Sequence, residues 1–241
     1  MIISRPVQYT SDVAGYRALY LALGLVELPA DSQGDGTADW AVFQAGSGRV
    51  ALHVVESGDP LDGGAALGFE TDDLDGAAER LAAVTEVRRF SRSDGKAISA
   101  TAPDGLHLVL LAPTAGRTAA EVPELASLGL WVTPDTAAAT AVVTALGLNG
   151  EVASTSGGWF QAAADGGGYC AVHSGDQPAP QVSFVYDGDV EALHERLQAA
   201  GIKSAVVDES YGRTLLVDRP GGGEPIWVNE RQTDLYGYLA L

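Results

Sequence analysis

The chain has 241 residues, 46% hydrophobic and 19% charged, which is a globular composition with enough apolar residues to form a core. Its formal net charge is -18 at pH 7, from 14 Lys and Arg against 32 Asp and Glu. A surface this acidic repels nucleic acids and anionic lipid headgroups, so we expect neither a nucleic acid nor a membrane as a partner.

The first predicted unit begins with a strand over residues 2–10, where Ile, Val, Tyr and Thr alternate with other residues. Asp12 can cap the following helix, in which apolar residues recur at helical spacing as far as Leu23. Gly24 supplies the left-handed stop. Three short strands then follow, over residues 25–28, 40–44 and 49–55. The unit therefore has the order β-α-β-β-β.

A second unit with the same order starts near Ala65. Its first strand spans residues 66–70, and its helix spans 74–83, with Leu74, Ala78 and Leu81 on one face. Its last three strands are predicted over residues 87–90, 98–102 and 107–111.

The second half of the chain repeats the first. Tyr9–Leu25 aligns without a gap with Val132–Leu148, which pairs Asp12 with Asp135 and places Gly147 opposite Gly24. The join falls in a stretch of Pro, Gly, Thr and Ala without periodicity. We therefore expect two domains and a linker, with boundaries at residues 1–114, 115–122 and 123–241.

Four βαβββ units, a helix opened by Asp and closed by Leu-Gly-Leu, and a last strand introduced by Pro-Asp-Gly resemble the vicinal oxygen chelate superfamily. This group contains glyoxalase I, extradiol dioxygenases, fosfomycin-resistance enzymes and bleomycin-resistance proteins. The resemblance covers almost the whole chain. It implies an α+β fold of two glyoxalase-like domains, each a curved mixed or antiparallel sheet with outer helices around a cavity.

Metal-using members of that superfamily carry His, Glu or Gln at one position in the first strand of a unit and one in the last. The first-strand positions fall here on Arg5, Ala66, Leu128 and Val182. The last-strand positions fall on Val109 and Trp227, and at or beside Leu52 and Val172. A divalent ion needs about three or four N, O or S donors, which these residues do not supply. We therefore expect no metal and no other cofactor.

His53 and His173 directly follow the last-strand positions of the first and third units. Either each histidine or its neighbours face the cavity, and the sequence leaves both directions open. A shift of one residue would bring the histidine into the cavity, and the unperturbed pKa of an imidazole, about 6.5, suits acid–base chemistry. The candidates for proton transfer are His53, His173, Glu230 and Tyr236.

Two similar stretches, Trp40–His53 and Trp159–His173, each join an aromatic strand through a Gly-rich turn to a strand that ends at histidine. We predict that they form aromatic walls of a ligand pocket. Arg5 is expected to be either exposed or matched to an acidic partner or a ligand, since burying an unpaired charge is costly. The predicted ligand-contacting residues are Trp40, Phe43, Trp159, Phe160, Tyr169, Trp227 and Arg5.

The single cysteine, Cys170, excludes an intrachain disulfide and is expected to be a buried small hydrophobe. The N-terminus lacks a basic start followed by a long apolar run, and no run approaches the ~20 apolar residues that span a bilayer. We therefore expect a cytoplasmic protein, either a monomer or a homodimer.

The resemblance implies a metal-independent protein like the bleomycin-resistance proteins, which binds a small hydrophobic or aromatic molecule and sequesters a drug or metabolite, as in antibiotic resistance. One alternative is a metal-free enzyme of natural-product metabolism on the same fold, namely an isomerase, a lyase or an accessory factor. Another is an interaction module whose pockets have collapsed. The sequence identifies neither the ligand nor whether one or both halves bind it.

Overall fold

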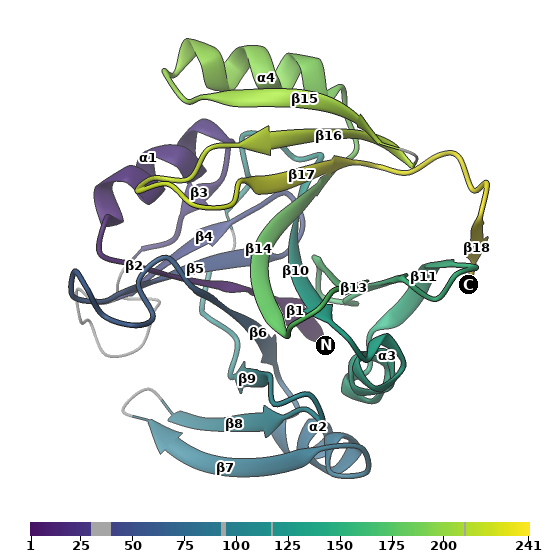
Figure 1. Cartoon of the computed structure of the whole chain (residues 1–241). Helices are drawn as coiled ribbons and strands as arrows, with labels where there is room; N and C mark the ends of the chain where they lie inside the picture. The colour runs from purple at the N-terminus through teal and green to yellow at the C-terminus, as the bar shows by residue number, and fades with distance from the viewer. Residues whose placement is uncertain (30–39, 93–94, 117, 210) are drawn as a thin grey trace.

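The computed structural model describes residues 1–29, 40–92, 95–116, 118–209 and 211–241 (Figure 1). Within these ranges the chain forms four helices and two nine-stranded sheets. Each helix lies between the first and second strands of one βαβββ unit, so the predicted α+β fold of four units is confirmed.

The first two units build one sheet. Its strand order is β3-β4-β5-β2-β6-β9-β8-β7, and β1 pairs with β6 off this path. Their elements are β1 (Ile2–Ser4), β2 (Val7–Thr10), α1 (Val13–Ala22), β3 (Val26–Glu27), β4 (Trp40–Gln44), β5 (Arg49–Val54), β6 (Ala65–Thr71), α2 (Leu74–Leu81), β7 (Glu86–Arg92), β8 (Gly95–Thr101) and β9 (His107–Leu111).

The last two units build the second sheet, in the order β15-β16-β17-β14-β10-β13-β12-β11-β18. Their elements are β10 (Leu125–Thr133), α3 (Thr136–Leu146), β11 (Asn149–Ser154), β12 (Trp159–Ala163), β13 (Tyr169–Ser174), β14 (Ala179–Tyr186), α4 (Val190–Ala199), β15 (Ser204–Glu209), β16 (Gly212–Val217), β17 (Ile226–Glu230) and β18 (Tyr238–Ala240).

An aspartate opens every one of the four described helices. The Asp12, Asp73 and Asp135 carboxylates each accept a hydrogen bond of 2.9 Å from a backbone amide three residues later. Asp189 accepts one of 3.1 Å from the amide of Glu191. A cap of this kind contributes about 1 kcal/mol to helix stability. The repeated aspartates are therefore local signals that fix where each unit turns from strand to helix.

The predicted first strand is split in two. Pro6, which has no backbone N–H to give to the sheet, lies between β1 and β2. Before it, β1 pairs with β6, and after it, β2 runs parallel to β5. The break leaves Arg5 between the two strands, where its side chain is buried.

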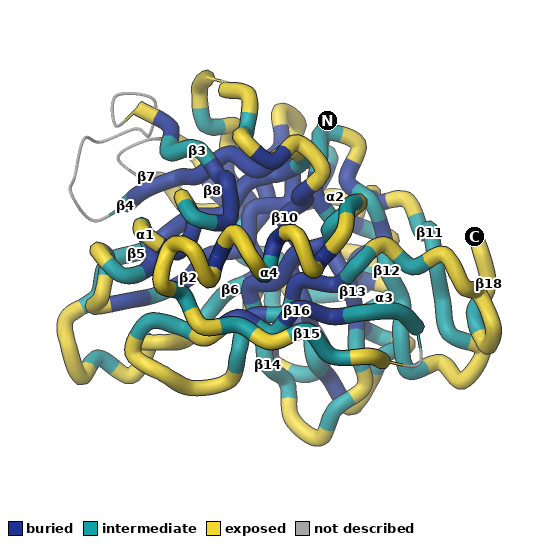
Figure 2. The backbone as a smooth tube through the Cα atoms, turned by 90° about the horizontal axis from the view of Figure 1, so that it is seen from above, coloured by how far each residue is buried: buried dark blue, intermediate teal, exposed yellow. Residues whose placement is uncertain are grey.

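The two halves share their hydrophobic cores. One core joins Leu81 of α2 to Val142 of α3, and the other joins Tyr20 of α1 to Leu193 of α4. A hydrogen bond of 2.8 Å from Trp131 Nε1 to Asp104 Oδ2 also links the second unit to the third. Figure 2 shows the resulting buried centre beneath helices whose outward residues are exposed. Each helix thus covers its own sheet and packs against a helix of the other half.

The C-terminal segment closes the second sheet on its open side. After β17 the chain crosses this side, at the right of Figure 1, and β18 pairs antiparallel with β11 at the far edge. The tail thus extends the second sheet by one strand. No helix in the described part of the chain is long and apolar enough to cross a membrane.

Candidate functional site

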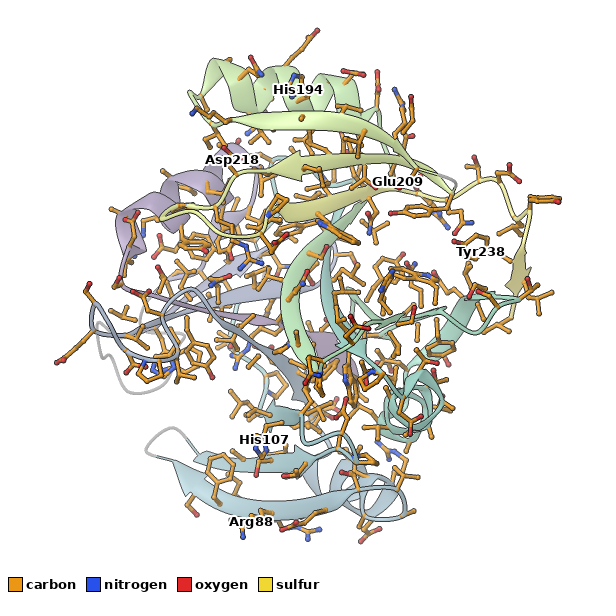
Figure 3. All side chains as sticks on the ribbon, viewed as in Figure 1. Arg88, His107, His194, Glu209, Asp218 and Tyr238 are labelled. Carbon is orange, nitrogen blue, oxygen red and sulfur yellow. The ribbon has the colours of Figure 1, made fainter. Side chains whose placement is uncertain are left out.

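A cavity of about 510 Å³ lies inside the curved second sheet. Strands β11, β12 and β13 supply one wall, and β14, β17 and the C-terminal segment supply the other. Its aromatic lining residues are Trp159, His173, Tyr211 and Tyr238. Figure 3 shows Tyr238 on the strand at the open side of this half.

Alternation along β12 and β13 decides which side chains reach the cavity. The ladder pairs Trp159 with His173, and both line the cavity. Val172, the residue directly before His173, points the other way and packs in the core beside α3. The direction that the sequence left open is therefore settled for His173, which faces the cavity while Val172 faces the core.

Three aromatic rings meet at one end of the cavity. The rings of Trp159 and His173 lie edge to face, with centroids 5.8 Å apart and planes at 78°. The ring of His173 in turn lies 6.2 Å from that of Trp227, at 89°. Edge-to-face contacts of this kind are favourable for aromatic pairs. Trp227 therefore supports the aromatic end of the cavity through His173.

Charged residues at the cavity rim are largely paired with one another. Both carboxylate oxygens of Glu230 accept hydrogen bonds from Arg213, at 2.5 and 3.0 Å. The contact with Glu230 raises the pKa of the Arg213 guanidinium. Arg231 donates to Asp187 at 2.9 Å. Of the proton-transfer candidates, Glu230 thus reaches the cavity as one half of an ion pair.

Three tyrosines of the second half lie in different environments. Burial raises the pKa of the Tyr211 phenol, whose hydroxyl lies 3.4 Å from Thr214 Oγ1. Tyr169 packs on the concave face beside Leu128, and burial also raises its pKa. Tyr236, another candidate for proton transfer, is 91% exposed and does not line this cavity.

Phe43 and Phe160 are corrections to the predicted pocket wall. Phe43 is fully buried and packs edge to face against Tyr20 of α1, with ring centroids 5.3 Å apart. Phe160 packs on the core beside α3. The ladders pair Trp40 with His53 and Trp159 with His173, so the residue equivalent to Phe43 is Ala162. The two Phe-Gln-Ala stretches, which match in sequence, therefore do not occupy equivalent positions in the two sheets.

In the first half, the corresponding concave face holds a buried ion cluster. Glu70 is fully buried between two arginines, with Arg5 Nη1 at 3.0 Å and Arg49 Nη1 at 2.6 Å from its carboxylate oxygens. Arg49 also donates to the backbone oxygens of Thr114 and Gly116, at 2.8 and 2.7 Å. Arg5 is therefore matched to an acidic partner, which was one of its expected outcomes.

The aromatic residues of the first half contact one another beside this cluster. Trp40 stacks on His53 with centroids 4.3 Å apart and planes at 20°, and Tyr9 lies 5.2 Å from His53. The guanidinium carbon of Arg5 is 6.0 Å from the Trp40 ring centroid, within cation–π range. His53 thus shares the concave face with Trp40, as His173 does with Trp159.

The positions that hold metal ligands in the superfamily do not suit a metal here. Leu128 and Trp227 lie on the concave face of the second half without an oxygen, sulfur or free nitrogen lone pair to offer. Val182 faces the core beside α4 and not the concave face. Among the described residues, no three His, Cys, Asp or Glu side chains converge as a metal site would require. The donor set therefore does not fit a divalent ion.

A second cavity, of about 540 Å³, lies between the two halves. Its lining comes from the start of α1, the loop before β6, the start of β14 and the turn before β17. The charged residues in this lining are Asp12, Asp62, Arg219 and Glu224. It has no tryptophan or histidine in its lining, in contrast to the cavity in the second half.

Several lining residues had no sequence signal. Tyr211 lies between β15 and β16, and Glu151 lies in β11, outside the repeated aromatic stretches. Tyr238 reaches the cavity only because β18 pairs with a strand more than eighty residues earlier, as in the hydrogen bond from Thr155 to Gly237. Contacts of this kind depend on the pairing of strands far apart in the sequence, so no local sequence pattern indicates them.

Comparison with solved structures identifies proteins that share this fold. No family model matches the chain, and no curated protein matches it in sequence. Among solved structures, a catechol 2,3-dioxygenase has a TM-score of 0.62 and 16% identity, over 99% of this chain and 94% of that one. The 2,3-dioxygenase LapB from Pseudomonas sp. KL28 has a TM-score of 0.66 and 15% identity, over 97% and 92%.

A third similar structure is homoprotocatechuate 2,3-dioxygenase from Brevibacterium fuscum in complex with 3,4-dihydroxyphenylacetate. It has a TM-score of 0.63 and 16% identity, over 96% of this chain and 80% of that one. All three are extradiol dioxygenases of the superfamily that the repeated units resemble. The chain therefore has the fold of the vicinal oxygen chelate superfamily, in its two-domain form.

Proposed function

We propose that the second half of the chain binds a small aromatic molecule in its concave cavity, without a metal ion at the superfamily's ligand positions. One observation carries this proposal: the cavity of about 510 Å³ has Trp159 and His173 at one end and Tyr238 at its open side. Ligand pockets are commonly about 300–1,000 Å³ and combine apolar or aromatic walls with a few polar groups.

The shape of the site suits a flat ring. The exposed faces and edges of Trp159, Tyr211 and Tyr238 offer large apolar areas, while Ser154, Gln161 and Asn229 add hydrogen-bonding groups. The structurally similar dioxygenase from Brevibacterium fuscum binds an aromatic compound, 3,4-dihydroxyphenylacetate. Both observations support an aromatic ligand of one or two rings.

Side-chain chemistry supports metal independence. An ion bound beside Leu128 and Trp227 would meet apolar side chains, and neither of them has an atom that can coordinate it. The proposed role is therefore reversible binding, as in sequestration of a drug or metabolite like that of the bleomycin-resistance proteins.

A metal-free enzyme, such as an isomerase or lyase, is the second candidate, because His173 lines the same cavity. A neutral imidazole there is able to accept a proton from a bound ligand. His173→Phe separates the two functions. Under sequestration the variant retains ligand binding, whereas under catalysis it retains binding and loses turnover of that ligand.

Isothermal titration calorimetry with phenol, catechol, indole and 2-naphthol, on protein treated with a chelator, tests the main proposal. We expect at least one of these compounds to bind, and Trp159→Ala to weaken its affinity about tenfold or more, since buried tryptophans often dominate binding energy. Trp40→Ala, at the equivalent place in the first half, is the matched control and leaves this affinity unchanged. Absence of heat with every compound, or equal effects of the two substitutions, would refute the proposal.

A further inference from the structure

We infer that the cavity of the second half selects positively charged aromatic ligands, that is, aromatic amines, and that Glu151 is the residue that selects them. This inference rests on the proposed function, since it names the class of molecule that the same cavity takes. It is carried by the arrangement of charges around the cavity.

Three charged residues line the cavity: Glu151, Glu230 and Arg231. Two of them already have partners of opposite charge. Glu230 is held by Arg213 through two hydrogen bonds, and Arg231 is held by Asp187 at 2.9 Å. Their charges are therefore compensated before a ligand arrives, and neither has to be matched by the ligand.

Glu151 differs from these two residues. None of the hydrogen bonds or ion pairs formed by the described residues involves its carboxylate, although its backbone oxygen accepts the amide of Leu241 at 2.9 Å. It lies in β11, at the irregularity in the β11–β12 ladder between Gly150 and Val152. Such an irregularity changes the direction in which a side chain points. Glu151 thus contributes to the cavity lining a negative charge that no hydrogen bond or ion pair of the described residues holds, although this charge also acts on the guanidinium of Arg231.

The neighbourhood of Glu151 also suits a cation bonded to an aromatic ring. Trp159 and Tyr238 line the same cavity and offer the electron-rich faces that attract ammonium groups. An aromatic amine can therefore place its ring against these side chains and its nitrogen towards the carboxylate. A carboxylate-bearing ligand of the same shape would instead meet the negative charge of Glu151.

The charge of the whole chain acts in the same direction. The net charge of -18 draws cations towards the surface and repels anions, although salt screens this long-range effect. The local contribution of Glu151 is short-ranged and remains when the salt concentration is raised. This difference in range allows an experiment to separate the two contributions.

Three indole compounds of similar size provide the test: tryptamine, tryptophol and indole-3-acetate, which are cationic, neutral and anionic at pH 7. Isothermal titration calorimetry in 0.3 M salt measures each affinity for the full chain. We expect tryptamine to bind about tenfold or more tightly than indole-3-acetate, the order expected for one partly screened charge pair. Tryptophol is expected to lie between them.

The decisive variant is Glu151→Gln, which keeps the size of the side chain and removes its charge. We expect the ratio between tryptamine and indole-3-acetate to fall to within about twofold, with tryptophol almost unaffected. Glu195→Gln is the matched control, because Glu195 is an exposed residue of α4 outside the cavity lining and its loss changes the net charge equally. This control leaves the ratio unchanged.

The outcomes separate the inference from the proposed function. If tryptophol binds and all three affinities are equal, or if Glu151→Gln leaves the ratio intact, charge selection by Glu151 is overturned while aromatic binding stands. If none of the three compounds binds, and the neutral compounds of the earlier panel also fail, the proposed function is overturned together with the inference. Preference for indole-3-acetate overturns the inference alone.

Discussion

The guanidinium of Arg5 lies 3.0 Å from the carboxylate of Glu70, and their side chains are 6% and 0% exposed. Arg5 occupies a first-strand position that serves metal-using members of the superfamily as a ligand site. Together with Arg49, it surrounds Glu70 and ties the concave face of the first half to the chain at Thr114 and Gly116. The first half thus uses this position for a buried ion cluster, while the second half keeps it apolar with Leu128.

Glu70→Gln is expected to lower the free energy of unfolding by about 3 kcal/mol, because it leaves two buried arginines without their counter-charge. Urea denaturation followed by circular dichroism measures this loss. Glu27→Gln breaks an ion pair whose Arg17 and Glu27 side chains are 43% and 32% exposed, and serves as control. Its cost should stay below about 1 kcal/mol. Similar costs for both substitutions would show that the cluster contributes little to folding.

Phe43→Ala should destabilise the chain by about 3–5 kcal/mol without changing ligand affinity, because it opens a void in the core beside Tyr20. The exposed Phe90 provides the comparison, and Phe90→Ala should change stability by about 0.5 kcal/mol or less. Both values come from denaturant unfolding. A Phe43 variant of normal stability and weakened ligand binding would contradict its placement in the core.

Tyr238→Ala should weaken aromatic ligand binding about 3- to 10-fold, the range of ~0.5–1.5 kcal/mol that an aromatic contact contributes. Its control lies two residues earlier, where Tyr236 is 91% exposed and outside the cavity lining. Calorimetric titration should find Tyr236→Ala indistinguishable from the unaltered chain. If Tyr236→Ala weakens binding and Tyr238→Ala does not, the path of the C-terminal segment differs from the one described.

The thiol of Cys170 should be unreactive in the folded chain. Cys170 is fully buried, and burial raises its pKa to about 12. A raised pKa keeps the thiol protonated at pH 8, and the thiolate is the reactive form. A colorimetric disulfide reagent should therefore label one equivalent of thiol only after unfolding in guanidinium chloride. Rapid stoichiometric labelling of the native chain would contradict this environment.

The fold was predictable because its signals are local and repeated. Asp12 and Asp135 each cap a helix through a hydrogen bond to an amide three residues away, and the same chemistry recurs at Asp73. These bonds need no knowledge of the distant chain. Four repetitions of such signals were enough to identify the βαβββ units and their resemblance to a known fold.

The candidate site was less predictable because strand register decides which residues face the cavity. A shift of one residue exchanges the two faces of a strand. The sequence similarity around Phe43 and Phe160 therefore suggested that both line a pocket, whereas both pack in the core. The ladders, which pair each tryptophan with its histidine, restore the correct register. Arg5 and Glu70 are 65 positions apart, and no local pattern connects them.

A crystal structure of the chain with tryptophol bound tests the central claim most directly, because it locates the ligand rather than inferring its place. We expect the indole ring to lie in the cavity of the second half, between Trp159 and Tyr238, with no ion coordinated beside Leu128 and Trp227. A ring bound in the cavity between the halves beside Arg219, or a metal ion coordinated in the second half, would contradict the account.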